Sequence, residues 1–405
     1  MTNRRLARRL NLHFSFLWAL FWSSSASLWG FRTVFLLHCG FSNSQIGLIS
    51  SCALLIPIAV QPMLASLGDR NSRMTSRNLA MGLTALSIVC CIGVWVSNHA
   101  FIYSVLLVVI GVALTVIVPY FNAMSMDFVI RGVDLNFGAS RSCGSVAYSL
   151  TSLVMGAALE RFAPTLILPV FLVSSAALLL ALFLFRYPLP SLPETEAKAA
   201  PVPLSNGALL RHYPRFALML AACFLLVGSQ STLTTYMIQI VGKVGGGESA
   251  TGIAYFFASG AELPAMLLFS RVRRKISLRS LMMFSAVFFV IRCAAFLLAG
   301  SIFTIYLACA LQFFAYAVLA LATVYYVSAE IDVVNQSKGQ ALIYIISSGP
   351  GSAFGSLCGG WMLDKLGVQP MLLFCCLCAA AGMLIMAAAL YTKRLKGNNL
   401  RSTLF

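Results

Sequence analysis

The chain has 405 residues, of which 60% are hydrophobic and only 10% are charged. A soluble domain carries about 25% charged residues, so the composition excludes an ordinary soluble protein. Runs of about 20 apolar residues recur along the whole length, and such runs are typical of membrane-spanning helices. The net charge of +17 would also suit a nucleic-acid-binding protein. The placement of the basic residues argues against nucleic acid as a partner, as shown below.

The apolar runs predict an all-α, polytopic membrane protein with twelve transmembrane helices. Helices are expected because backbone polar groups inside a bilayer must be satisfied within the segment itself. The basic N-terminus leads into a long apolar run without a small-residue cleavage site, which indicates a first helix and not a removable signal. The expected spans are 12–37, 45–67, 78–97, 101–130, 139–160, 164–186, 214–240, 250–270, 279–298, 301–327, 338–362 and 370–392.

The lysines and arginines lie almost entirely on one side of this arrangement. The outer loops carry only Arg161, Lys243 and Lys365, whereas most of the 28 basic residues fall at the termini and in the inner segments. The positive-inside rule therefore places both termini in the cytoplasm. We expect a multi-pass protein of the plasma (inner, cytoplasmic) membrane. Attraction to anionic membrane lipid accounts for the basic charge without nucleic acid.

Residues 187–213 interrupt the apolar pattern with a proline- and alanine-rich stretch, which indicates a cytoplasmic linker. We expect an N-terminal six-helix bundle at 1–186, the linker at 187–213 and a C-terminal six-helix bundle at 214–405. An internal repeat supports two halves, because the end of span five at 156–161 (GAALER) resembles the end of span eleven at 360–365 (GWMLDK). Two parallel halves with a site between them at mid-membrane are typical of transporters.

Charged and polar residues remain inside spans four and five. A charge in a bilayer costs about 2.5–3.5 kcal/mol on insertion scales, so it is rarely kept without a use. Arg141 and Tyr148 lie on one helix face together with two serines. This face offers a cation, hydroxyl groups and an aromatic ring to a solute. Asn122 and Asp127 are about 140° apart around their helix, so they are not expected to serve one site.

A second pair of charges, Glu262 and Arg292, lies in spans eight and nine. A buried glutamate must be protonated, paired or in contact with water. Burial favours its neutral form and a neighbouring cation favours its charged form. A glutamate that alternates between these surroundings would take up and release a proton. The alternative is a static structural pair.

Three further features of the sequence stand out. Arg32 lies toward the outer end of span one on the same face as Trp29; it either snorkels to the outer interface or faces the cavity, where it would favour a carboxylate or many hydroxyls. Gly351, Gly355 and Gly359 recur at every fourth position, which is typical of close helix packing and would also let two halves rock. The twelve cysteines show no zinc spacing and are interpreted as packing thiols.

With these features the sequence resembles members of the major facilitator superfamily. The resemblance is to the branch with lactose permease, other oligosaccharide–proton symporters and the phenylpropionate transporter. The stretch QPMLASLGDRNSR at 61–73 is similar to the family's loop after span two. In that loop an aspartate and basic residues form a cytoplasmic latch. The resemblance therefore implies that Asp69, Arg70 and Arg73 take part in gating.

Residues 136–148 are similar to the span-five segment of the sugar symporters. There the matching arginine grips substrate hydroxyls and the matching aromatic residue stacks on a sugar ring, which implies these roles for Arg141 and Tyr148. Lactose permease has a tryptophan where this chain has Tyr148. Asn122 falls near the family's span-four acid, so a neutral amide replaces that acid, and the resemblance does not imply galactoside specificity. Trp29 and Arg32 are further candidates for substrate binding.

Glu262 and Arg292 resemble the span-eight glutamate and span-nine arginine of the same branch. The histidine and glutamate of span ten in lactose permease are absent, and Gln312 lies in that region. The span-seven acids and the span-eleven lysine are also absent, with Gln230 in span seven. If the protein is proton-driven, Glu262, with Arg292, therefore remains as the main proton carrier. If it is not, the protein is a facilitator.

The resemblance implies a secondary active transporter that imports a small polar organic solute, a sugar or oligosaccharide first of all, with protons by alternating access. The alternatives are an aromatic acid or nucleoside symporter, an exporter of the same fold, or a transport-dead sensor. The chain shows no HExxH helix, no buried catalytic pair and no cofactor loop, so we expect neither an enzyme nor a cofactor or metal. The expected partners are the solute, the proton and membrane lipid, and the expected state is a monomer.

Overall fold

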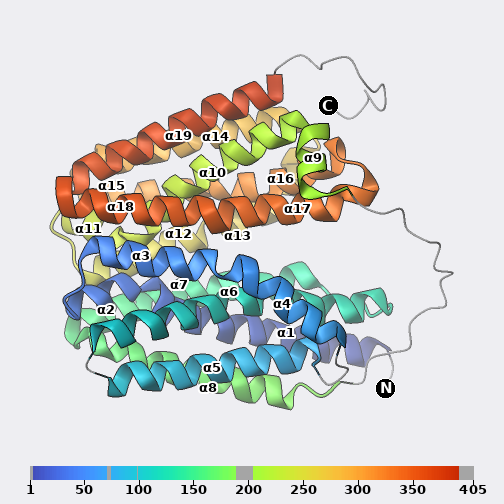
Figure 1. The fold of residues 1–405 in the computed structure, drawn as a ribbon, viewed down its shortest axis with the longest axis horizontal. Helices are drawn as coiled ribbons and strands as arrows, with labels where there is room; N and C mark the ends of the chain where they lie inside the picture. Colours follow the sequence, from blue (N-terminus) through green and yellow to red (C-terminus); the bar gives the residue numbers. More distant parts are fainter. Residues whose placement is uncertain (1–2, 71–73, 98, 188–203, 392–405) are drawn as a thin grey trace. The chain divides into compact units, whose positions relative to one another are not determined.

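The computed structural model describes residues 3–70, 74–97, 99–187 and 204–391, and throughout these ranges the regular structure is helical (Figure 1). Within these ranges, eleven helical segments are long and apolar enough to cross a membrane. They match eleven of the twelve expected spans. The first expected span, 12–37, falls on α1 (Asn3–Ser25), the π-helical turn η1 (Ala26–Gly30) and α2 (Arg32–His38). The prediction of an all-α, polytopic membrane fold is confirmed.

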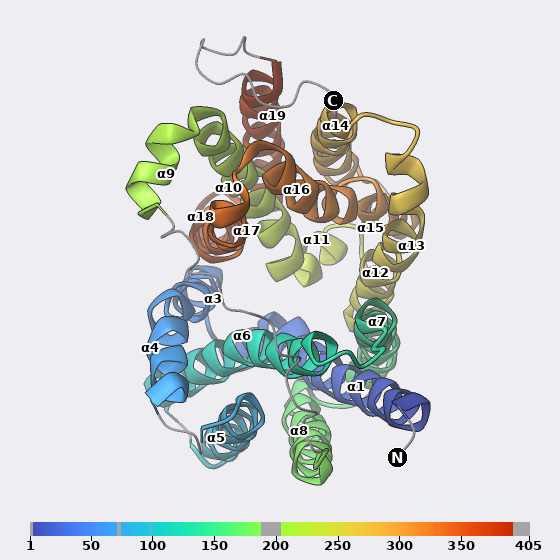
Figure 2. The same ribbon diagram turned by 90° about the vertical axis from the view of Figure 1, so that its right-hand side faces the viewer.

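One compact unit consists of the described residues of 3–187 together with Gly247–Ser259. In this unit α1 packs on α7 and α8, and α5 packs on α6 and α8. Figure 2 shows these helices nearly end-on, with α5 and α8 side by side. Besides α1, η1 and α2, the elements of this unit are α3 (Asn43–Leu55), α4 (Pro57–Arg70), α5 (Ser76–Val96), α6 (Ala100–Ile130), α7 (Phe137–Arg161), η2 (Pro164–Leu166), α8 (Ile167–Leu184) and α12 (Glu248–Gly260).

The second compact unit consists of the described residues of 204–246 and 260–391. Helix α10 forms its core, because it is the most buried candidate span and packs on both α18 and α19. The elements are α9 (Asn206–His212), α10 (Pro214–Thr235), α11 (Met237–Gly242), α13 (Glu262–Arg273), α14 (Leu278–Leu297), α15 (Ile302–Ala310), η3 (Leu311–Phe313), α16 (Tyr316–Glu330), α17 (Val333–Ile346), η4 (Ser347–Gly351), α18 (Ser352–Leu366) and α19 (Val368–Tyr391).

The boundary between the two units falls inside the eighth expected span. Helix α12 packs with the first unit and α13 belongs to the second, and the helix is interrupted at Ala261 between them. The close packing of α12 rests on glycine: a Cβ on Gly252 would lie 2.5 Å from the carbonyl oxygen of Ser152 and 2.7 Å from Cα of Gly156 on α7. The six-plus-six domain bounds expected from the sequence stay a prediction.

The described part of the expected linker, 204–213, contains the short helix α9 and is fastened to the start of α17. The backbone N–H of Leu204 donates to Oδ1 of Asn335 (2.9 Å), and Nζ of Lys338 donates to the carbonyl oxygen of Leu204 (2.5 Å). The hydroxyl of Tyr213 donates to a carboxylate oxygen of Asp332 (2.6 Å). This end of the linker is therefore attached to the second unit.

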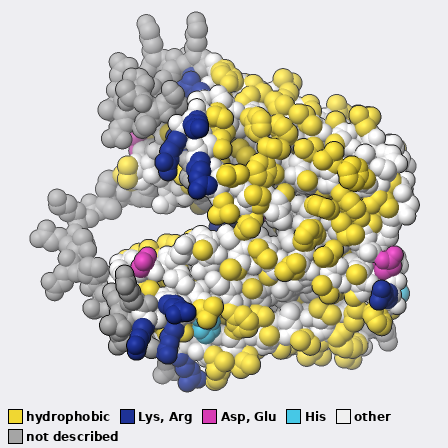
Figure 3. Space-filling model, turned by 180° about the vertical axis from the view of Figure 1, so that it is seen from behind, with side chains coloured by type: hydrophobic (Ala, Val, Ile, Leu, Met, Phe, Trp, Pro, Cys, Tyr) yellow, Lys and Arg dark blue, Asp and Glu magenta, His cyan; other side chains and the backbone are white. Residues whose placement is uncertain are grey.

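Basic side chains gather at one end of each unit, and apolar side chains cover much of the visible surface between the ends (Figure 3). Large exposed hydrophobic residues occur along most of the spans. Such a surface is stable only in a hydrocarbon environment, because exposing it to water would be costly. The structure therefore agrees with a multi-pass membrane protein.

The glycine stripe of the eleventh span packs directly on α10. A Cβ on Gly351 would lie 2.8 Å from the carbonyl oxygen of Phe224, and a Cβ on Gly355 would overlap the carbonyl group of Gly228. The hydroxyl of Thr232 donates to the carbonyl oxygen of Gly355 (2.8 Å). The interpretation of the stripe as a site of close helix packing is confirmed within the second unit.

Replacement of Gly355 by alanine should lower the Tm of the purified protein. The added methyl group would overlap the Gly228 carbonyl, and overpacking of this kind costs about 1–3 kcal/mol. Gly82→Ala is the matched control, because a Cβ at this exposed position of α5 meets nothing within 4 Å. Thermal unfolding in detergent measures both variants, and equal Tm values for the two would contradict the packing described here.

Candidate functional site

One polar and aromatic face forms where α1 packs on α7. Gly144 has no side chain, and Cδ1 of Trp22 occupies the space that a Cβ there would need. The ring of Trp22 lies 6.0 Å from the ring of Tyr148 in an edge-to-face arrangement. The guanidinium carbon of Arg141 lies 6.0 Å from the ring centroid of Trp18, within reach of a cation–π interaction. The structure thus brings the predicted residues Arg141 and Tyr148 together with two tryptophans.

Arg141 remains exposed on this face, so its guanidinium can still reach a solute. Trp18 and Trp22 are not among the substrate-site residues predicted from the sequence. Their spacing of four residues places both rings on one face of α1, and this was the available signal. The spacing does not predict which helix packs against that face of α1.

A second cluster surrounds Arg32, which is buried. Its Nε donates to the hydroxyl oxygen of Ser50 (3.0 Å), and Nη1 donates to the carbonyl oxygen of Trp29 (2.6 Å). Its guanidinium carbon lies 4.4 Å from the ring centroid of Trp29. The ring of Trp29 also lies against Gly111, where a Cβ would approach it to 2.5 Å. Arg32 is therefore held inside the first unit and does not extend to an outer surface.

Trp29 belongs to η1, one of two π-helical turns in the structure's described part. Single π-helical turns inside α-helices are frequent at functional sites, because the extra residue displaces the side chains around it. The second turn, η4, contains Ser347 and Ser348. Each unit therefore contains one such turn.

Asn122 of α6 has an unusual environment. Its Oδ1 is buried and accepts no hydrogen bond from the residues that the structure describes. A buried acceptor without a donor costs about 1–3 kcal/mol, so a water or a ligand is expected to supply the donor. Asp127, five residues later, is exposed. This difference agrees with the expectation that the two residues do not serve one site.

Four polar side chains form a continuous chain of hydrogen bonds in the second unit. Nε2 of Gln312 donates to Oε1 of Glu262 (2.5 Å), and Nε2 of Gln230 donates to Oε1 of Gln312 (3.0 Å). Nη1 of Arg292 donates to Oε1 of Gln230. The structure therefore connects the predicted pair of Glu262 and Arg292 through two glutamine amides.

Each member of this chain comes from a different element, and two members lie where a transmembrane span is interrupted. Gln312 lies in η3, a single 3-10 turn between α15 and α16, and Glu262 is the first residue of α13. The positive end of the helix dipole favours a carboxylate at such an N-terminus. Interrupted transmembrane helices commonly carry the polar sites of transporters.

Arg292 is almost completely enclosed, with 1% of its surface exposed. Its Nε donates to the carbonyl oxygen of Ala308 (3.1 Å), and its guanidinium carbon lies 5.4 Å from the ring centroid of Phe296. Nη2 is buried and meets no acceptor within the described ranges. A cation in this position depends on the few partners that it has, because water cannot replace them.

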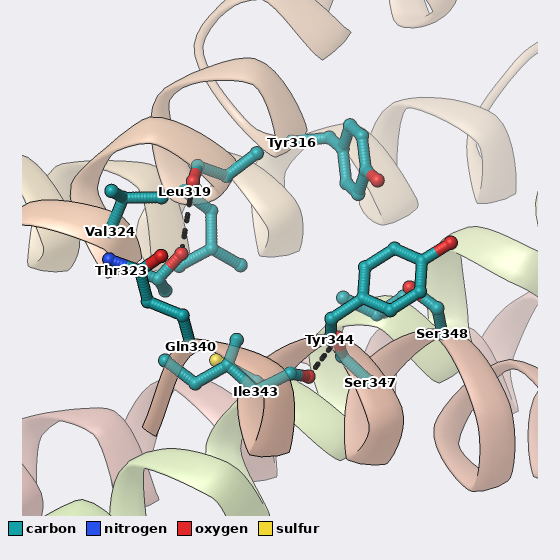
Figure 4. A pocket seen from close by; sticks show the side chains of 12 residues that line it. Tyr316, Leu319, Thr323, Val324, Gln340, Ile343, Tyr344, Ser347 and Ser348 are labelled. Atoms are coloured by element: carbon teal, nitrogen blue, oxygen red, sulfur yellow. Dashed lines mark hydrogen bonds between the residues drawn. The ribbon is translucent and has the colours of Figure 1, made fainter. Parts of the chain in front are cut away.

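A pocket of about 150 Å³ lies between α16 and α17 and reaches α10 (Figure 4). Tyr316 and Tyr344 contribute aromatic rings, and Gln340 contributes an amide. The hydroxyl groups of Thr323 and Ser347 donate to the backbone carbonyls of Ala320 (3.0 Å) and Ile343 (2.6 Å), so their oxygens can still accept hydrogen bonds. At about 30 Å³ per water the pocket holds about five waters, which is enough for part of a small solute.

The predicted gating residues are described only in part. Asp69 and Arg70 form the end of α4. Arg73, and the side chains of Asp69 and Arg70, lie outside the described part of the chain. Within 3–70, 74–97, 99–187 and 204–391, His, Cys, Asp and Glu side chains form no group of three that could hold a metal ion.

Residues 11–376 match the sequence profile of the MFS_1 like family. The chain belongs to this family. It is therefore a transporter of the major facilitator superfamily (MFS) and not an enzyme. The predicted resemblance is confirmed at the level of the superfamily.

Two curated relatives extend over most of this MFS transporter. The maltose permease of Geobacillus stearothermophilus is 26% identical over 361 residues, which cover 88% of each chain. The uncharacterized transporter YwbF of Bacillus subtilis (strain 168) is 24% identical over 342 residues, which cover 84% of this chain and 83% of the relative.

Solved structures share the fold. The nucleoside transporter NupG aligns with a TM-score of 0.75 at 15% identity, over 95% of this chain and 100% of NupG. A D-xylose–proton symporter aligns with a TM-score of 0.67 at 12% identity, over 93% of this chain and 96% of the symporter. At these identities the likeness concerns the fold alone.

Gly144→Ala should weaken solute binding by this MFS transporter. The new methyl group would take the place of Cδ1 of Trp22, so the indole must shift. Because a misplacement of about 1 Å at a site can cost about 100-fold, we expect the transport KM to rise about tenfold or more.

Gly138→Ala is the control in the same helix, because the nearest side-chain atom would lie 3.9 Å from its Cβ. Initial rates of uptake of the labelled solute give both KM values. A KM for Gly144→Ala equal to that of Gly138→Ala would show that the Trp22 face does not contact the solute.

Proposed function

We propose that this MFS transporter imports a small polar organic solute, a sugar or short oligosaccharide, together with protons by alternating access. The observation that carries the proposal is the hydrogen-bonded chain from Glu262 to Arg292, which connects an ionisable carboxyl group with a buried cation inside the membrane-spanning part. Ionisable groups at such depth are costly and usually mark ion or substrate pathways.

Sugar as the solute is supported by the relative at 26% identity, which is a maltose permease. The face made by Arg141, Tyr148 and Trp22 has suitable chemistry, because the apolar side of a sugar ring packs on aromatic rings while a guanidinium donates to its hydroxyls. Asn122 would supply an amide whose oxygen is still without a donor among the described residues. Trp29, positioned by Arg32, would contribute a further ring in the same unit.

The pocket of the second unit offers the same combination of groups. Tyr316 and Tyr344 supply rings, and Gln340, Thr323 and Ser347 supply an amide and hydroxyl groups (Figure 4). A volume of about 150 Å³ is below the roughly 300–1,000 Å³ of sites that enclose a drug-sized ligand. We therefore propose that this pocket contacts one part of the solute.

In this proposal Glu262 carries the proton and Arg292 is its counter-charge. The gating role of Asp69, Arg70 and Arg73 and the cytoplasmic location of both termini remain part of the proposal. The gathering of basic side chains at one end of each unit supports that orientation, because positive charge is enriched on the cytoplasmic side of membrane proteins (Figure 3).

Purified protein in proteoliposomes should accumulate labelled maltose when an inward proton gradient is applied. Unlabelled sugars should compete for this uptake, whereas nucleosides and phenylpropionate-like acids should not. Competition by a nucleoside or an aromatic acid, without competition by sugars, would replace the sugar assignment with that solute. Uptake that is the same with and without the proton gradient would identify a facilitator.

Glu262→Gln should abolish uphill uptake and leave the exchange of labelled for unlabelled solute. The amide cannot carry a proton, whereas exchange needs no net proton movement. Glu248→Gln, which changes the other glutamate of the eighth span, is the matched control and should retain uphill uptake. Uphill uptake by Glu262→Gln at the wild-type level would show that Glu262 is not the carrier.

A further inference from the structure

The hydrogen bonds between Glu262 and Arg292 pass through two residues that the proton pathway of the proposed function does not include. We propose that Gln312 and Gln230 are positioning residues: their side-chain amides form a relay through which the charge of Glu262 sets the hydrogen bonding of Arg292. This inference rests on the proposed function, because it takes Glu262 as the proton carrier. It adds a physical link from that carrier to the buried cation.

Arg292 determines the direction of the relay. A guanidinium group has donors only, so it must face the amide oxygen of Gln230. The NH2 group of Gln230 then points to the oxygen of Gln312 (3.0 Å), and the NH2 group of Gln312 points to Glu262 (2.5 Å). Every donor along the chain points away from Arg292. The chain therefore ends on an oxygen of Glu262 that accepts.

An ionised carboxyl group matches this end of the chain, because it has acceptors only and because hydrogen bonds to charged groups are stronger than neutral ones. A protonated carboxyl group also has an O–H donor. If this donor faces Gln312, the Gln312 amide must turn over to accept it, and Gln230 must then turn as well. The NH2 group of Gln230 would then face the donors of Arg292. When the O–H donor faces Gln312, protonation of Glu262 therefore opposes the hydrogen bond between Gln230 and Arg292.

The three residues of the chain beyond Glu262 are all buried, so water cannot readily replace a lost partner there. Gln230 is 7% exposed, Gln312 is 5% exposed and Arg292 is 1% exposed. Unpaired buried donors are costly, and Nη2 of Arg292 already lacks an acceptor among the residues of the described ranges. Loss of Gln230 as an acceptor would leave a second nitrogen of the guanidinium unpaired. A change at Glu262 is therefore expected to displace Arg292.

Glu262 is the carboxyl group at the far end of the hydrogen-bonded chain from Arg292, and the thiols of Cys293, Cys309 and Cys375 lie near the guanidinium. The elements packed on α13 are η3 and α16, and Tyr316 is the first residue of α16. The other titratable groups of α13 and α16 lie about two turns or more along these helices from Glu262 and Tyr316: Arg271, Arg273, Tyr325, Tyr326 and Glu330. Among the titratable groups of α13 and α16, Glu262 is therefore the one at the end of the relay.

Two residues of the relay lie at positions where a transmembrane helix is interrupted. Gln312 lies in the 3-10 turn η3, and Glu262 follows the interruption at Ala261 where the chain passes from the first compact unit to the second. Such positions absorb backbone rotation more readily than the middle of a regular helix. A turn of the Gln312 amide would therefore act on segments that can adjust.

A mutant cycle on the purified protein tests the relay without any solute. The Tm shifts caused by Glu262→Gln and Arg292→Lys should not add in the wild-type background, because residues in one hydrogen-bond network are coupled. In a Gln312→Met background, and likewise in a Gln230→Met background, the two shifts should add. Coupling of the same size in all three backgrounds would overturn the relay and would indicate direct electrostatic action.

Transport by proteoliposomes provides the second readout. For Gln312→Met and for Gln230→Met, proton-driven accumulation of labelled maltose should fall about tenfold, within the 5–150-fold range typical of coupled sites, while exchange persists. The double variant should lose no more than either single variant, because the two amides act in series. Gln336→Met is the control: this glutamine donates to the carbonyls of Ser328 and Ile331 outside the relay, and its loss should leave accumulation unchanged.

The two readouts separate the relay from the proposed function. A wild-type protein without proton-driven uptake would overturn the proposed function, and the Tm cycle would still decide whether the glutamines couple Glu262 to Arg292. Both glutamine variants could instead lose exchange as well as proton-driven accumulation, while the coupling in the Tm cycle stays unchanged. That result would show that the amides serve packing only.

Discussion

The structure depends on one constraint: within a bilayer, a polar group must find its hydrogen-bond partner inside the protein. Arg292 shows the consequence most clearly, because it is buried and receives its acceptors from Gln230 and from the backbone of Ala308. Arg32 obeys the same rule with Ser50 and the carbonyl oxygen of Trp29. In water, each of these cations could exchange its partners freely. In the membrane the loss of one acceptor is costly, and this makes the partners of a buried cation suitable for coupling.

Close backbone contacts supply the second organising feature. Gly252 lets α12 approach Gly156 of α7, Gly355 lets the eleventh span approach α10, and Gly144 makes room for the ring of Trp22. Without a hydrophobic force between helices in lipid, contact at short range through small residues holds such bundles together. The same contacts place the aromatic and amide groups of the candidate sites. Packing and the geometry of the sites are therefore not independent of each other in this protein.

Much of the candidate site could be predicted because charges in apolar spans stand out in a sequence. Arg141 with Tyr148, and Glu262 with Arg292, stand out in this way. The structure places Arg141 and Tyr148 each near a tryptophan of α1 and connects Glu262 to Arg292 by hydrogen bonds. Gln312 and Gln230 were noted only as replacements for charged residues, because an amide in an apolar span gives a weaker signal than a charge. Their importance follows from the bonds that they make, which join positions 50, 62 and 82 residues apart.

The order of apolar residues along the sequence by itself determined the helical class, the membrane location and the positions of eleven of the twelve spans, since hydrophobicity adds up over about 20 neighbouring residues. The uneven distribution of basic residues along the chain was also a property of the sequence by itself. Only the tertiary structure decided that the first span contains a π-helical turn, that Trp22 rests on Gly144, and that α12 packs with the first unit. The same holds for the chain of amides between Glu262 and Arg292. The physical reason is that such contacts depend on which helix faces meet and where a helix is interrupted, and short-range patterns carry neither.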